Sequence, residues 1–248
     1  MQRIGLVTGA ARGIGSAIAR KIIAHVDRLI LIDLDRKLMT ELKISLMSSK
    51  PIIIKQCDIG SSRQVNKMLE AVIEKFGIPN ILINNAGIGG PFHRVDQVTD
   101  KEWIKIINTN LKGLFNLCRF LLPLMKEMHY GRIVNIASTQ GYLGAALSST
   151  YVASKHGVVG YTRAIAAEWG AYGITCNAVC PGYVDTSMGV QNSISDHEKK
   201  IIAKTPLARI ALPDEIADLV IHLIKDESAF INGSIIPIDG GLTCHVGI

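Results

Sequence analysis

The segment Tyr151-Val-Ala-Ser-Lys155 places a phenol and an ammonium four residues apart. In a helix, side chains at that spacing lie on one face, one turn from each other. A phenol alone is a poor acid with a pKa near ~10, and a nearby cation stabilises the phenolate and lowers that pKa. The pair therefore predicts a group that exchanges protons near neutral pH. The same spacing is also common in helices without any such role.

Two polar residues elsewhere in the chain are candidates to join this pair. Ser138 follows the apolar run 132–137, which we interpret as a buried strand. Open parallel sheets bind ligands at the carboxyl ends of their strands, so Ser138 is expected at such an end. Asn110 lies within a long apolar helix pattern. A buried amide needs hydrogen-bond partners, and these are more often structural than catalytic.

The elements that must position these residues alternate along the chain. Apolar runs typical of buried parallel strands are separated by longer helical patterns. This order predicts an α/β fold, a doubly wound Rossmann sheet of about seven parallel strands with helices on both faces. No repeat or linker divides the chain, so residues 1–248 are expected to form a single domain. Strands are predicted at 4–8, 29–32, 52–56, 81–84, 132–137, 174–179 and 234–238, and helices at 13–25, 37–48, 61–76, 99–128, 150–172 and 214–225.

A glycine-rich turn, Thr8-Gly9-Ala-Ala-Arg12-Gly13-Ile14-Gly15, follows the first strand and opens the first helix. Gly9 permits the tight turn, Gly13 lets the backbone approach a pyrophosphate, and Gly15 allows close packing of helix on strand. The helix N-terminus then faces the anion. The motif predicts a dinucleotide site, and a glycine-rich turn without a ligand is the alternative.

The second predicted strand ends in Asp33, at the distance from the glycines that the dinucleotide fingerprint expects. A carboxylate there accepts hydrogen bonds from the adenosine ribose and repels a 2′-phosphate, which favours NAD over NADP. Leu34 occupies a position where a basic side chain would favour NADP, whereas Arg12 is placed to reach the same phosphate. Asp33 is also a residue type that starts turns.

Three further turns follow predicted strands. Asp58 is suited to the adenine amine, with Ile59 beside the ring, although Asp58 is nearly as well suited to start a helix. Small residues in 84–87 keep the backbone close to a cofactor, and its Asn amides are expected to tie neighbouring strands. In 181–186 the backbone and the Thr186 hydroxyl are placed to hold a carboxamide. Each segment taken alone also fits an ordinary turn.

Together these segments resemble the short-chain dehydrogenase/reductase family. The order Thr-Gly-x-x-x-Gly-x-Gly, Asn-Asn-Ala-Gly, Ser, Tyr-x-x-x-Lys and Pro-Gly-x-Val-x-Thr extends from Thr8 to Thr186. The stretch from Thr205 to Gly241 is similar to the 3-oxoacyl reductase branch of that family.

The resemblance implies a role for each candidate. Tyr151 would be the acid/base, and Lys155 would hold the nicotinamide ribose and lower the tyrosine pKa. Ser138 would bind the substrate oxygen, and Asn110 would hold a water that links Lys155 to solvent. The residues implied to line the cofactor are Gly9, Arg12, Gly13, Ile14, Gly15, Asp33, Asp58, Ile59, Asn85, Ala86, Gly87, Tyr151, Lys155, Pro181, Gly182, Val184 and Thr186.

The expected activity is that of an NAD(P)-dependent oxidoreductase, with NAD favoured, that interconverts a ketone and a secondary alcohol. A 3-oxoacyl or 3-hydroxyacyl thioester or short acid is the favoured substrate. An acyl carrier protein is a doubtful partner, because His129 and Tyr172 stand where carrier reductases have arginine. The alternatives are a dehydrogenase of a sugar, polyol or diol, and a non-catalytic NAD-binding regulatory protein. The intact Ser138–Tyr151–Lys155 set argues against the regulatory protein.

Composition limits the other partners. The net charge is +6, but the longest basic runs are pairs, so we expect no nucleic-acid binding. No apolar run approaches the ~20 residues of a membrane span, and strand pattern begins by Ile4, so we expect neither a membrane anchor nor a signal peptide. The five cysteines are scattered, without metal spacing, which indicates free thiols in a reducing cytoplasm.

Two expectations concern larger assemblies and motions. The family resemblance implies a homotetramer formed through the helices predicted at 99–128 and 150–172. The polar segment 187–204 follows the last cofactor turn and is expected to act as a lid over the substrate, and a mobile surface loop is the alternative.

Overall fold

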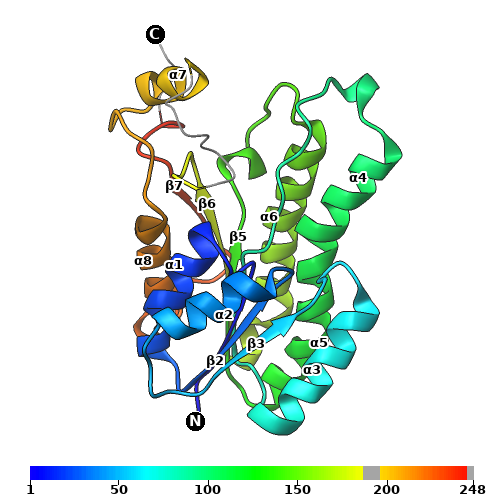
Figure 1. Ribbon diagram of the computed structural model, residues 1–248, viewed down its shortest axis with the longest axis vertical. Coiled ribbons are helices and arrows are strands. Elements are labelled where there is room, and N and C mark those ends of the chain that lie inside the picture. The colour runs from blue at the N-terminus through cyan, green and yellow to red at the C-terminus, as the bar shows by residue number, and fades with distance from the viewer. Residues whose placement is uncertain (187–195, 245–248) are drawn as a thin grey trace.

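The computed structural model describes residues 1–186 and 196–244. Its centre is a seven-stranded parallel sheet in the order β3-β2-β1-β4-β5-β6-β7, with a layer of helices on each face (Figure 1). This is the doubly wound α/β fold predicted from the sequence. The strands are β1 (Ile4–Thr8), β2 (Arg28–Asp33), β3 (Ile52–Gln56), β4 (Ile81–Asn84), β5 (Gly131–Ile136), β6 (Ile174–Pro181) and β7 (Ile235–Ile238).

The helices divide between the two faces of the sheet. One face is covered by α1 (Gly13–Ile22), α2 (Arg36–Ser45) and α8 (Pro213–Leu223), whose buried residues form one core with β1 and β2. The other is covered by α3 (Ser62–Phe76), α5 (Gly113–Glu127) and α6 (Ser149–Trp169). Because both faces are covered, central strands such as β1, β5 and β6 are buried along their whole length, which explains their continuous apolar runs.

Most element boundaries lie within a few residues of the predicted ones, and β6 shows why one boundary moved. The strand continues past the predicted end at Val179, because Cys180 and Pro181 pair with Pro237 and Ile238 of β7. This pairing carries β6 directly into the predicted cofactor turn. Side-chain caps fix two helix starts: Ser61 caps α3, and Thr99 forms a capping box at the start of α4 (Asp100–Ile107).

The continuous helix predicted over 99–128 is wrong in its middle. A π-helical turn, Asn108–Lys112, separates α4 from α5. The wider turn accommodates one extra residue in the helix, and it contains the buried Asn110. Hydrogen bonds from Asn110 to segments distant in the chain stabilise this turn, so helical periodicity alone did not reveal it.

The segment expected to form a lid lies partly outside the described residues. Nothing is described for 187–195, whereas 196–204 forms helix α7 (Asp196–Lys204). No helix was predicted there, because the segment is mostly polar. Ile201 is buried and its carbonyl accepts the Thr205 hydroxyl at 2.9 Å, so the helix end is fixed by the following turn.

Candidate active site

The ends of β1 and β4 are held together by a threonine and an asparagine. The Thr8 hydroxyl accepts the backbone N–H groups of Asn85 and Ala86, each at 3.0 Å. The Asn85 amide donates to the carbonyls of Thr8 and Gly9 at 3.0 and 3.1 Å. These bonds confirm that an Asn amide ties the neighbouring strand ends. They also show that the Asn85 side chain holds the glycine-rich turn, and the contact of Asn85 with a cofactor stays a prediction.

Two glycines of the glycine-rich turn lie where a side chain would meet close neighbours. A Cβ on Gly15 would overlap the Gly9 carbonyl oxygen. Gly13 has φ +55°, and a Cβ there would lie 3.1 Å from Cγ2 of Thr186. The chain therefore brings the start of α1 against the turn after β6. The close contacts require glycine at position 15 and disfavour any side chain at position 13. This narrow cradle at a helix N-terminus fits the pyrophosphate of a dinucleotide.

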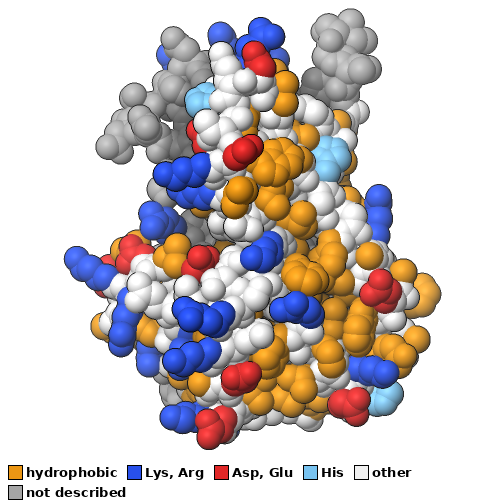
Figure 2. Space-filling view, turned by 90° about the vertical axis from the view of Figure 1, so that its right-hand side faces the viewer, with side chains coloured by type: hydrophobic (Ala, Val, Ile, Leu, Met, Phe, Trp, Pro, Cys, Tyr) orange, Lys and Arg blue, Asp and Glu red, His pale blue; other side chains and the backbone are white. Residues whose placement is uncertain are grey.

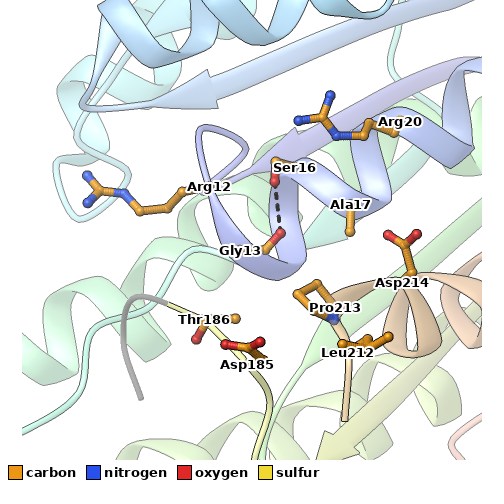
Figure 3. Close-up of a pocket in the computed structure, with 10 residues that line it drawn as sticks. All are labelled: Arg12, Gly13, Ser16, Ala17, Arg20, Asp185, Thr186, Leu212, Pro213 and Asp214. Atoms are coloured by element: carbon orange, nitrogen blue, oxygen red, sulfur yellow. Dashed lines mark hydrogen bonds between the residues drawn. The ribbon is translucent and has the colours of Figure 1, made fainter. Parts of the chain in front are cut away.

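A cavity of about 680 Å³ opens beside this cradle. Figure 3 shows the start of α1 on one side and the segments 185–186 and 212–214 on the other. Arg12, Gly13 and Thr186 line it, and their contact with a cofactor stays a prediction. Sequence reasoning did not include Ser16 and Arg20, because only the helix turn brings them to the cavity. The remaining lining residues are Ala17, Asp185, Leu212, Pro213 and Asp214.

Asp33 has a structural role in addition to the predicted one. Its Oδ2 accepts the Ala11 N–H at 3.0 Å, and its Oδ1 accepts the N–H groups of Leu34 and Asp35 at 2.7 and 3.1 Å. The carboxylate thus starts the turn after β2 and fixes the glycine-rich turn. Arg12 lies 3.8 Å from the carboxylate of Asp35, within ion-pair distance. Ribose binding by Asp33 stays a prediction.

The two residues predicted to contact the adenine, Asp58 and Ile59, also have structural roles. Asp58 Oδ1 accepts the Gly60 N–H at 2.9 Å, so this residue starts a turn, which is close to the alternative role considered for it. Ile59 is almost fully buried, and its side chain fills the space that a Cβ on Gly113 would need. The Ile59 side chain therefore packs in the core, and Ile59 would contact the adenine ring mainly through its backbone.

The last cofactor turn, 181–186, is fixed at two points. Gly182 donates its N–H to the Ile238 carbonyl at 3.1 Å, at the end of β7. Val184 forms an isolated parallel bridge with Ala211, in the segment that leads into α8. The turn is therefore held on both flanks, and it faces the glycine-rich cradle through Thr186.

Ser138, Tyr151 and Lys155 meet at the carboxyl end of β5. The Ser138 side chain lies close enough to Tyr151 to lower the pKa of its phenol, and the Ser138 hydroxyl accepts the Gln140 N–H at 3.2 Å. Lys155 is buried, and its Nζ lies 5.6 Å from the Tyr151 ring centre and donates to the Ile136 carbonyl at 2.8 Å. The structure thus brings the three predicted catalytic residues together, with Tyr151 and Lys155 one helical turn apart on α6.

The prediction that the pKa of Tyr151 is lowered is wrong when only the groups of the protein are considered. Burial raises the pKa of Tyr151, and the neighbouring Ser138 side chain lowers it in part. Burial also lowers the pKa of Lys155, to about 8. The spacing argument considered the attraction between the two groups but omitted the cost of removing both from water. Tyr151 is therefore a phenol that holds its proton firmly, which suits a proton donor.

Asn110 forms a hydrogen-bonded clamp. Its Oδ1 accepts the Ile88 N–H at 2.8 Å, and its amide donates to the Ile88 carbonyl at 3.0 Å and to Ser154 Oγ at 3.1 Å. Ser154 in turn donates to the Tyr151 carbonyl at 2.7 Å. A Cβ on Gly87 would lie 3.4 Å from Asn110 Oδ1 and 3.6 Å from Lys155 Nζ, so both groups border the space beside Gly87. The water-relay role of Asn110 stays a prediction.

Ser154 and Cys180 are site residues that sequence reasoning missed. Ser154 is fully buried between Asn110 and the Tyr151 carbonyl, and the need of Asn110 for a partner was the available signal. Cys180, at the end of β6, lies near Ser138 and Lys155. Burial raises the pKa of the Cys180 thiol to about 11, although Ser138 and Lys155 lower it in part. No sequence pattern pointed to it.

We expect Ser154→Ala to lower kcat about tenfold and the free energy of unfolding by about 1 kcal/mol, because a buried amide loses a partner and the Tyr151 turn loses a tether. Steady-state kinetics and denaturant unfolding measure the two effects. Ser62→Ala is the matched control, since the Ser62 hydroxyl donates to the buried Asn116 at 2.9 Å, between α3 and α5. The control should lose stability and keep kcat. Equal kcat in both variants would contradict a positioning role for Ser154.

The comparisons with known proteins agree with this geometry. A family model described as enoyl-(acyl carrier protein) reductase matches residues 9–243. The chain is 36% identical over 243 residues to an acetoacetyl-CoA reductase of Shinella zoogloeoides, covering 97% of this chain and 98% of the relative. It is 34% identical over 244 residues to the 3-oxoacyl-(acyl-carrier-protein) reductase FabG of Pseudomonas aeruginosa, covering 97% of each.

The chain belongs to the short-chain dehydrogenase/reductase family. A solved actinorhodin polyketide ketoreductase with NADPH is similar to it, with a TM-score of 0.92 and 33% identity over 98% of both chains. As a member of this family, the protein is an oxidoreductase that uses a nicotinamide cofactor and acts on a carbonyl or its alcohol. The 3-oxoacyl-reductase-like branch predicted from the sequence is confirmed.

Two kinds of feature are absent from residues 1–186 and 196–244. None of the helices in these ranges has the length and apolar character needed to cross a membrane. Within the same residues, no group of His, Cys, Asp and Glu side chains is arranged to hold a metal ion.

Proposed function

We propose that the protein reduces the ketone of a 3-oxoacyl thioester to the 3-hydroxy compound with NADH. The observation that carries the proposal is the grouping of Ser138 and Tyr151 beside the buried Lys155, whose Nζ lies 5.6 Å from the Tyr151 ring centre. Two relatives matched over nearly their full length, an acetoacetyl-CoA reductase and a 3-oxoacyl-(acyl-carrier-protein) reductase, support the substrate class. We also place the protein in the cytoplasm, in keeping with its five free thiols, of which four are buried.

The site residues divide the chemistry among themselves. When bound, the reduced nicotinamide supplies a hydride to the carbonyl carbon. Ser138 orients the carbonyl oxygen through its hydroxyl, and Tyr151 donates the proton to the same oxygen. Its raised pKa keeps the phenol protonated, as reduction requires. Lys155, fixed on the Ile136 carbonyl, is placed to hold the nicotinamide ribose.

A substrate screen tests this proposal. Purified protein is given NADH or NADPH with acetoacetyl-CoA, longer 3-oxoacyl thioesters and acetoacetate, and, in the reverse direction, NAD or NADP with sugars, polyols and diols. We expect the highest kcat/KM with a 3-oxoacyl-CoA. Preference for a polyol would replace the proposed substrate class. Cofactor binding without turnover on any compound would support a regulatory NAD-binding protein instead.

We favour a coenzyme A thioester over one on a carrier protein. His129 and Tyr172 replace the arginines expected in a carrier reductase. The Tyr172 ring lies 4.6 Å from Lys126 Nζ and 6.1 Å from the Trp169 ring, so this surface is built around packed aromatic rings. Comparison of kcat/KM for the same acyl group on coenzyme A and on acyl carrier protein tests this choice, and an advantage of the carrier form would overturn it.

We propose NAD as the preferred cofactor, because Asp33 and Asp35 place two carboxylates at and just after the end of β2, where the adenosine ribose of a dinucleotide lies. The related ketoreductase solved with NADPH shows that NADP is used within the family. Asp33→Asn removes one charge and retains most of the hydrogen bonds of the turn. We expect it to shift the ratio of kcat/KM values toward NADPH by about tenfold, because repulsion of the 2′-phosphate falls.

The matched control for Asp33→Asn is Asp27→Asn. The Asp27 carboxylate accepts the Arg3 N–H at 2.7 Å, before β2 and at the opposite end of that strand. The Asp27 charge is too far from the cofactor site to discriminate between NADPH and NADH. The ratio of kcat/KM values for NADPH and NADH in Asp27→Asn should therefore equal that of the wild type. An unchanged ratio in Asp33→Asn would assign Asp33 to the turn alone.

We further propose that the protein is a homotetramer that uses the face of α4, α5 and α6. An apolar groove of about 510 Å³ runs between Leu111 and Phe115 on one side and Gly160 and Ala164 on the other. Trp103, Ile104 and Phe115 are exposed in the single chain. Figure 2 shows hydrophobic side chains gathered over one side of the molecule among scattered charges. Such a patch is typical of a surface covered by a partner.

Gly160→Glu should reduce the assembled mass to that of a dimer or monomer, measured by light scattering. A Cβ on Gly160 meets no atom within 4 Å, so the change is tolerated inside the chain, whereas an interface would bring the new charges into an apolar environment. Gly160→Ala is the control and should keep the wild-type mass. A monomeric wild type would end the tetramer proposal.

A further inference from the structure

The turn after β7 is organised by a single carboxylate. Asp239 Oδ1 accepts the Gly241 N–H at 3.0 Å, and Oδ2 accepts both the N–H and the hydroxyl of Thr243, at 3.0 and 2.6 Å. We call residues 239–244 the β7 turn. Leu207 donates its N–H to the Gly240 carbonyl at 3.2 Å, so the turn is also held from the segment after α7. Thr243 is consequently fixed in position.

Thr243 connects this turn to the one that carries Ser138. Its hydroxyl lies 3.1 Å from the Tyr142 hydroxyl. Because Thr243 gives its own proton to Asp239, Tyr142 is the donor in this bond. Burial raises the pKa of Tyr142, which keeps the donor proton in place. A chain of two hydrogen bonds therefore runs from Tyr142 to a carboxylate in a distant part of the sequence.

Tyr142 closes the short helical turn that Ser138 opens. Ser138 is the N-cap of the 3-10 turn Thr139–Gly141, and Tyr142 is its C-cap. Gly141 donates its N–H to the Ser138 carbonyl at 2.8 Å, and Tyr142 donates its N–H to the Thr139 carbonyl at 3.3 Å. Tyr142 also packs against the small apolar cluster that includes Val159 and Cys180. Any displacement of Tyr142 is therefore transmitted to Ser138 over a single turn of backbone.

We propose that Asp239, Thr243 and Tyr142 form a positioning relay, in which the β7 turn holds the Ser138 turn in register with Tyr151. Tyr142 and Thr243 are positioning residues, since their effect on the substrate oxygen passes through Ser138. Asp239 also lies against Gly182 of the cofactor turn 181–186, where an added Cβ on Gly182 would be 2.9 Å from Asp239 Cβ. Variants of Thr243 and Tyr142 therefore separate the relay from cofactor binding, whereas variants of Asp239 do not.

The experiment uses Tyr142→Phe, Thr243→Val and their double variant in the full chain. Hydrogen exchange followed by mass spectrometry should show several-fold faster exchange at amides 140–143 in each single variant, with β2 unchanged. With the substrate found in the screen, kcat/KM should fall about fivefold while the dissociation constant of NADH stays constant. The double variant should be no worse than either single variant, because both remove the same bond. Thr40→Val, which removes an exposed hydroxyl bonded to the Arg36 carbonyl, is the control.

Several outcomes would overturn the relay. Unchanged exchange at 140–143, additive losses in the double variant, or a loss confined to NADH affinity would each contradict it. Thr243→Ser, which restores the hydroxyl, should recover wild-type exchange and kinetics even if Thr243→Val folds poorly, and failure to recover would count against the relay. The kinetic readout rests on the proposed function. If the wild type reduces no compound in the screen, that function fails, and the exchange data alone decide the relay.

Discussion

Replacing Tyr151 with phenylalanine should reduce kcat about a thousandfold and leave the dissociation constant of NADH within about twofold of the wild type. The hydroxyl lost is the one that faces Ser138, and the ring that remains preserves the packing of a partly buried residue. Because burial raises the pKa of this phenol, carbonyl reduction by the wild type should stay constant through neutral pH and decline only under alkaline conditions, where the proton is lost.

Kinetics and fluorescence titration of NADH check the two halves of this prediction. Tyr172→Phe is the matched control, because this ring packs beside Lys126 outside the site. The control should keep wild-type turnover. If Tyr151→Phe retained more than about a tenth of the activity, the proton would have to come from another group, and the assignment of Tyr151 as the acid would be rejected.

Gly15→Ala should weaken NADH binding about a hundredfold, which corresponds to about 2.8 kcal/mol. The added Cβ would overlap the Gly9 carbonyl oxygen and lie 2.6 Å from the Asn85 amide nitrogen. Both neighbours belong to the network that joins β1 to β4, so the start of α1 must move away from the cradle. Forced packing of this kind costs up to about 3 kcal/mol, and we expect the free energy of unfolding to fall by that amount.

Gly144→Ala is the control for added volume, since a Cβ there meets no atom within 4 Å. It should leave NADH binding unchanged and stability equal or slightly higher, because alanine restricts the unfolded chain. Calorimetric titration and denaturant unfolding compare the two variants. Wild-type NADH affinity in Gly15→Ala would show that the cradle is not where the dinucleotide binds.

Some features of this protein were determined by local sequence. The central strands are buried on both faces, so each appears as a short apolar run, and the alternation with helices indicated the sheet type. The glycine-rich turn, Ser138 and the Tyr151–Lys155 pair were recognisable because each motif has a local geometric requirement: a missing side chain, a strand end, or one helical turn. The family resemblance then supplied the roles that residue types alone left open.

The π-helical turn at Asn110 shows what local sequence does not reveal. Helical periodicity is the same on both sides of it, and the interruption is stabilised by the backbone of Ile88 and by Ser154, far away along the chain. The Asn110–Ser154–Tyr151 contacts exist only when α6 packs beside this turn. The relay through Thr243 depends in the same way on the β7 turn reaching Tyr142.

The sequence by itself determined the order of strands and helices, the glycine cradle and the Tyr151–Lys155 pair on one helix face, because each depends on residues close together in the chain. Only the tertiary structure decided the pKa direction of Tyr151 and Lys155, the hydrogen-bonding partners of Asn110 and Asp33, and the attachment of the Ser138 turn. These depend on burial and on contacts between distant segments, and solvent exclusion at a packed site outweighs the attraction that neighbouring residue types suggest.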